Sequence, residues 1–209
     1  GYPESTFRLM AVSETIVREF FELHGFFVRQ NRKHIAPKRE DDEIDFYVHN
    51  PSGPAEGQEV PFVLEAAPDL AHLTRAVVVV KAWHTEVFTQ AVLAHAPEMF
   101  RFAGPETFAR ATEAFGGPGP LTKILVVPAL PASGEARQQS IDLLQSKGID
   151  AVIPFRTMLS DLIEHIEVNR NYQKSDLLQV IRILKNYDLF APPQLELFDS
   201  PKRKRKPKG

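Results

Sequence analysis

The chain lacks cysteine altogether: none of its 209 residues is one. That absence excludes disulfide frameworks, thiolate zinc sites, iron–sulfur ligation and cysteine nucleophiles. It is also typical of proteins from a reducing compartment. Since 43% of the residues are apolar, a chain of this length can bury a core that needs neither a disulfide nor a metal to fold.

Long hydrophobic runs are missing as well. The longest, residues 76–80, is far too short to span a bilayer, and residues 1–12 lack the charged-then-apolar order of a secretory signal. We therefore expect a cytoplasmic protein with no membrane partner. The seven histidines show no spacing typical of a metal site, and the glycine-rich stretch 116–119 lacks the lysine and hydroxyl of a phosphate-binding loop.

Basic residues are scarce outside the C-terminal end. Residues 201–209 hold six of the 25 and no acid, which leaves 19 basic against 27 acidic residues and a net charge of about −8 for the rest of the chain. Such an acidic body is unsuited to non-specific DNA binding. The tail is either a nucleic-acid arm or a solubilising end, and we favour the arm. Its DNA-contacting residues are then Lys202, Arg203, Lys204, Arg205 and Lys206.

Hydrophobic periodicity predicts an α/β fold with a central mixed β-sheet flanked by helices. We expect a single domain over residues 1–190, with the helices of 157–187 packed on it, and a basic, flexible tail over 191–209. The predicted helices are 13–25, with Ser13 as its cap, 85–95, 105–115, 133–147, 157–168 and 175–187. The predicted strands are 26–30, 44–48, 76–81, 122–128 and 149–154, with a further short one at 61–65.

Three charged residues occupy unusual places in this pattern. Glu14 lies in the opening helix, Asp45 in a short apolar strand, and Lys81 ends the run Val77–Val80. A charge at the end of a buried strand is costly unless it is paired or exposed at a site. The tips of central strands are also where open α/β sheets place their ligands.

Taken in order, these motifs resemble the PD-(D/E)XK, or restriction-endonuclease-like, nuclease superfamily, and in detail its small resolvase-like members. The matching positions are Glu14, Gly25, Asn31-Arg32, Glu43-Ile44-Asp45 and Val79-Val80-Lys81. The resemblance implies a restriction-endonuclease-like core and a DNA-processing function with Mg²⁺- or Mn²⁺-dependent phosphodiester hydrolysis. It implies that Asp45 is the principal metal ligand, Glu14 an auxiliary ligand and Lys81 the catalytic lysine.

One position departs from the family pattern. The second carboxylate of the motif lies two residues before the lysine, where this chain has Val79. Glu86, which the periodicity places in the following helix, is our first candidate for a relocated catalytic acid, ahead of Glu98 and Glu65.

Two alternatives to an endonuclease remain open, the first because of Val79 and the acidic surface, the second if the motif matches arise by chance. The first is a catalytically degenerate nuclease fold that binds DNA or a protein. The second is a plain α/β interaction domain in which Glu14, Asp45 and Lys81 point to different faces. The helix predicted over 175–187 is a candidate homodimer interface.

Overall fold

The computed structural model describes residues 4–31, 44–54 and 59–190. The chain divides into two compact units, residues 1–164 and residues 165–209. The first unit holds the whole β-sheet, and the second holds the last helix, α6 (Asp176–Asn186).

Five strands form one mixed sheet in the first unit, arranged in chain order. They are β1 (Phe27–Gln30), β2 (Phe46–His49), β3 (Arg75–Val80), β4 (Thr122–Val127) and β5 (Ala151–Pro154). β2 is antiparallel to β1 and β3, whereas β3, β4 and β5 are parallel to one another. Four strands therefore end, and β2 begins, at the same end of the sheet. The predicted α/β class with a mixed sheet between helices is confirmed.

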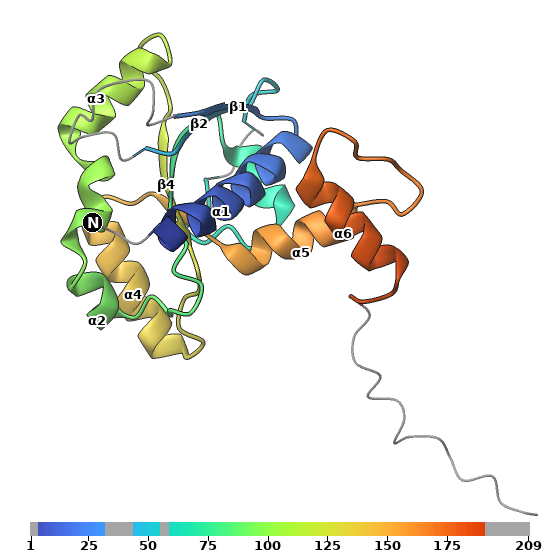
Figure 1. The fold of residues 1–209 in the computed structure, drawn as a ribbon. Coiled ribbons are helices and arrows are strands. Elements are labelled where there is room, and N and C mark those ends of the chain that lie inside the picture. Colours follow the sequence, from blue (N-terminus) through green and yellow to red (C-terminus); the bar gives the residue numbers. More distant parts are fainter. Residues whose placement is uncertain (1–3, 32–43, 55–58, 191–209) are drawn as a thin grey trace, which may run out of the picture. The chain divides into compact units, whose positions relative to one another are not determined.

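One face of the sheet packs on four helical segments (Figure 1). These are α2 (Gln90–Ala94), the 3-10 helix η2 (Pro97–Ala103), α3 (Pro105–Ala114) and α4 (Gly134–Ser146). Val77 and Val79 of β3 share a buried cluster with Leu93 of α2, Met99 of η2 and Leu144 of α4. The side chains at alternate positions of β3 thus form the core on this side.

The opposite face is covered by α1 (Glu4–Leu23) and α5 (Phe155–His165) (Figure 1). Both helices bury aromatic or aliphatic side chains, namely Val17, Phe20, Phe21, Met158 and Leu162. His24, just past the end of α1, joins the two helices, because its Nε2 lies 2.5 Å from Oδ2 of Asp161 in α5. A sheet buried on both faces explains the unbroken apolar run of β3.

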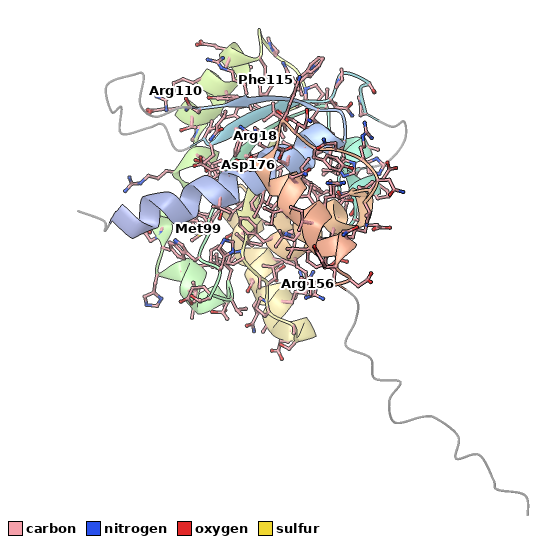
Figure 2. The ribbon with its side chains drawn as sticks, turned by 45° about the vertical axis from the view of Figure 1, so that its right-hand side comes forward. Arg18, Met99, Arg110, Phe115, Arg156 and Asp176 are labelled. Carbon is pink, nitrogen blue, oxygen red and sulfur yellow. The ribbon has the colours of Figure 1, made fainter. Side chains whose placement is uncertain are left out.

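At the far end of β3, Arg75 organises the glycine-rich loop that follows α3. Its Nε donates to Pro120 O (3.2 Å), and its Nη1 donates to Phe115 O (3.4 Å) and Gly117 O (3.1 Å). The guanidinium also lies 5.3 Å from the ring centroid of Phe115. Figure 2 shows Phe115 on the same side of the molecule as Arg110 of α3. This loop therefore has a structural anchor.

Three sequence predictions fail locally. α1 begins at Glu4, so Ser13 lies inside the helix instead of capping it. The helix predicted over 85–95 is only α2, because Thr89 caps it: the Thr89 Oγ1 accepts the Val92 N–H at 3.2 Å. Residues 61–65 form no strand, only an isolated bridge between Val63 and Val152. The 3-10 helix η1 (Ala67–His72) follows that segment.

The second unit is built around α6. Ser175 caps this helix by accepting the Leu178 N–H at 3.3 Å. Arg182 Nε and Lys185 Nζ donate to the carbonyls of Val168 (2.7 Å) and Ile166 (2.8 Å). Apolar side chains stay exposed along one stripe of α6 and just beyond it: Val180, Ile183, Tyr187, Leu189 and Phe190.

None of the described helices is both long and apolar enough to cross a membrane. The basic segment 202–206, Arg32 and Glu43 lie outside the described residues.

Candidate functional site

Asp45 lies immediately before β2 and is buried, with 4% of its surface exposed. Its backbone N–H donates to Val78 O (3.0 Å), and its carbonyl accepts the Asn31 N–H (2.8 Å). Its Oδ2 accepts the Val80 N–H at 2.7 Å. The carboxylate thus acts as an acceptor for the backbone at the end of β3, and this bond offsets part of the cost of burying its charge.

Glu14 reaches the same end of the sheet from α1. Its Oε2 accepts a hydrogen bond from Gln30 Nε2 at 2.7 Å. Gln30 is the last residue of β1 and pairs with Phe46, the residue that follows Asp45. A side-chain contact and a strand pairing therefore connect the Glu14 carboxylate to the segment that carries Asp45.

Lys81 is the first residue after β3, and its N–H donates to Val126 O at 3.1 Å. It directly follows Val80, the residue whose N–H is bonded to the Asp45 carboxylate. Its side chain is partly exposed. Asp45, Glu14 and Lys81, which are far apart in the chain, thus all lie at the end of the sheet where β1 and β3 finish.

A contact that the sequence did not reveal lies beside this group. Ser13 Oγ and His84 Nε2 are joined by a hydrogen bond of 2.9 Å. The His84 ring also makes an edge contact with Phe155, with centroids 4.6 Å apart. Ser13 is buried, so it cannot serve as a nucleophile, and the contact holds α1 against the segment that follows Lys81. No local pattern reveals a pair separated by 71 residues.

Val79, at the position of the missing carboxylate, is 1% exposed and belongs to the apolar cluster on the α2–α4 face. An acid there would enter the core, so the site must do without a ligand from this position.

The candidate replacement acids lie elsewhere. Glu86 is exposed in the turn before α2, where its N–H donates to Trp83 O at 2.8 Å. Glu65 is paired with Arg137 at 2.6 Å. Glu98 lines a surface pocket together with Trp83. Within the described part of the chain, none of these three glutamates is hydrogen-bonded to the Asp45 side chain.

Within the described ranges, no group of three or more histidine, aspartate or glutamate side chains is arranged to hold a metal ion. Two carboxylates nevertheless fit Mg²⁺, because this ion keeps several waters and often takes only one or two protein carboxylates together with substrate phosphates. A carboxylate has several acceptor positions, so the hydrogen bonds that Asp45 and Glu14 accept do not by themselves prevent either from binding a metal.

The chain matches no family model, no curated protein and no solved structure. What it does must therefore be inferred from its own residues.

Proposed function

We propose that this chain has a restriction-endonuclease-like core and processes DNA by Mg²⁺- or Mn²⁺-dependent hydrolysis of phosphodiester bonds. The observation that carries the proposal is the convergence of Glu14, Asp45 and Lys81 at one end of the sheet. The order of the elements that carry them agrees with it: an acid-bearing helix, a strand, an acidic strand start and a lysine that ends a buried strand.

The roles follow from the chemistry of the side chains. Asp45 and Glu14 would hold the divalent ion, which when bound neutralises the phosphate and activates a water. Lys81 carries its positive charge at a partly exposed strand end, where it can stabilise the negative charge that develops on the phosphate oxygens. The hydrogen bonds from Val80 and Gln30 fix the orientation of the two carboxylates before substrate arrives.

The test is cleavage of plasmid, linear and branched DNA by the full chain with Mg²⁺ or Mn²⁺. We expect Asp45→Asn and Lys81→Met each to lower the cleavage rate by about a hundredfold or more. Asp142→Asn, which changes an exposed acid of α4, is the matched control and should cleave like the unmodified chain. Equal cleavage by all four proteins would refute the assignment of the site.

Asp45→Asn is preferable to Asp45→Ala for this test. Asparagine keeps a side-chain oxygen for the Val80 N–H, whereas alanine leaves that buried donor without its partner at a cost of about 1–3 kcal/mol. Urea unfolding of Asp45→Asn should confirm that lost cleavage is not lost folding.

A second candidate function is a catalytically degenerate nuclease fold that binds DNA or a partner protein without cutting. The apolar burial of Val79 and the structural bond of Asp45 to Val80 favour it. Calorimetry with Mn²⁺ separates the two functions. Binding that Asp45→Asn abolishes supports the nuclease, and no heat of binding in the unmodified chain supports the degenerate module.

A further inference from the structure

A surface pocket of about 550 Å³ opens between Trp83 and the segment formed by α2 and η2. It is lined by Trp83, Ala91, Val92, His95, Ala96 and Glu98. Its volume lies within the range of small-ligand sites. Trp83 follows Lys81 by two residues. One wall of the pocket is therefore close in sequence to the lysine proposed to stabilise charge on the phosphate.

The aromatic wall of the pocket is anchored yet accessible. Trp83 keeps 43% of its surface exposed. Its ring meets the fully buried Phe88 edge to face, with centroids 5.7 Å apart. An indole held from one side, in a pocket otherwise lined largely by alanine and valine, is suited to stacking against a flat ring.

Besides the indole N–H of Trp83, which is a donor, the polar side chains that line the pocket are those of His95 and Glu98. His95 Nδ1 lies 2.7 Å from Ala91 O. Because a carbonyl only accepts, Nδ1 is the donor in this contact. The Glu98 carboxylate is exposed, and a carboxylate only accepts hydrogen bonds. The pocket therefore suits a flat ligand whose edge presents adjacent donors.

We propose that this pocket binds an unpaired guanine of the nucleic-acid substrate, an inference that rests on the proposed function. Among the four DNA bases, only guanine presents two neighbouring N–H donors on its Watson–Crick edge, and a carboxylate matches both. Stacking on Trp83 supplies affinity, and Glu98 supplies the preference for guanine. Since a paired guanine cannot offer this edge, the substrate is single-stranded or frayed near the scissile phosphate.

The chain contains one tryptophan, so its fluorescence reports on this pocket directly. The experiment titrates the full chain, without a divalent metal, with short thymidine oligonucleotides that carry a central guanine, inosine, adenine or thymine. Tryptophan quenching and the anisotropy of a labelled strand are measured together. We expect quenching by the guanine strand, about tenfold weaker affinity for the inosine and thymine strands, and no quenching by a blunt duplex of the same sequence.

Two variants and a control complete the test. Glu98→Gln should remove the preference for guanine over thymine but keep the stacking, whereas Glu113→Gln, an exposed acid of α3 outside the pocket, should change neither. Trp83→Leu should weaken binding of the guanine strand about tenfold by anisotropy, and Trp83→Phe should restore most of it.

Anisotropy that rises without quenching, or equal quenching by guanine and thymine strands, would overturn the pocket while leaving the proposed nuclease intact. Guanine-specific quenching with no metal-dependent cleavage would support the pocket and refute catalysis.

Discussion

At the scale of single residues, Asp45 has a structural role in addition to its place in the candidate site. Its Oδ2 accepts the Val80 N–H, so the carboxylate is part of the sheet as well as part of the candidate site. Val79, the residue before Val80, packs in the apolar core. The same end of the sheet thus has a structural acid just before β2 and a buried apolar side chain in β3.

Gly119 provides a residue-scale prediction. A Cβ there would lie 2.3 Å from Arg75 Nη2, and Arg75 cannot easily move because it donates to three loop carbonyls. We expect Gly119→Ala to lower the free energy of unfolding by about 1–3 kcal/mol, measured by urea titration followed by circular dichroism.

The control for that variant is Gly134→Ala in the first turn of α4, where a Cβ meets nothing within 4 Å. Alanine favours helix over glycine, so this variant should be neutral or stabilising by up to about 1 kcal/mol. Equal effects of the two substitutions would show that Arg75 does not hold the loop as described.

At the scale of elements, α1 and α5 are joined by a shielded polar pair. The side chains of His24 and Asp161 are 17% and 8% exposed, whereas those of the surface pair Arg137 and Glu65, at a similar separation, are 31% and 68% exposed. Water screens the second pair far more than the first. The first pair should therefore contribute more to stability.

Double-mutant cycles with alanine at both positions of each pair test this difference. We expect a coupling of about 1–3 kcal/mol between His24 and Asp161, and less than about 1 kcal/mol between Arg137 and Glu65. The free energies come from urea unfolding at one fixed pH. A larger coupling in the surface pair would contradict the role given to the α1–α5 contact.

Element type was predictable wherever a long periodic pattern acted alone. The apolar run of β3 and the stripes of α4 and α6 all lie within two residues of their predicted bounds. Prediction failed where a single side chain decided a boundary, as Thr89 does for α2. It also failed for Ser13, because α1 begins at Glu4 and Ser13 lies inside the helix.

The candidate site was predictable in part. The order of charged residues along the chain indicated Glu14, Asp45 and Lys81 as candidates. In the structure all three lie at one end of the sheet. The hydrogen bonds that hold the two carboxylates were not predictable, since they depend on the pairing of β1 with β2 and of β2 with β3.

At the scale of the whole molecule, charge is divided between an acidic body and a basic C-terminal end. Deleting residues 201–209 removes six basic residues and no acid. We expect the truncated chain to lose most of its salt-sensitive DNA binding, and the slope of log K against log salt to become shallower by about 0.9 for each phosphate that the tail no longer neutralises. Anisotropy titrations on a labelled duplex over a range of salt concentrations measure both quantities.

A chain with 202–206 changed to glutamine separates charge from length, because it keeps the length of the tail while removing five of its six basic residues. It should behave like the deletion. If either variant binds duplex DNA as tightly as the unmodified chain, the DNA-binding surface lies on the acidic body.

The bond between Asp45 and Val80 also bears on how related chains should be compared. A related chain without the proposed catalytic function would still need an acceptor at the start of β2, so an invariant aspartate at this position would record selection for folding. Among the described residues, the backbone N–H of Lys81 donates to Val126 O, whereas its side chain takes no such part in the sheet. Replacement of that lysine by neutral residues, with the aspartate retained, would indicate the related chains that lack the proposed catalytic function.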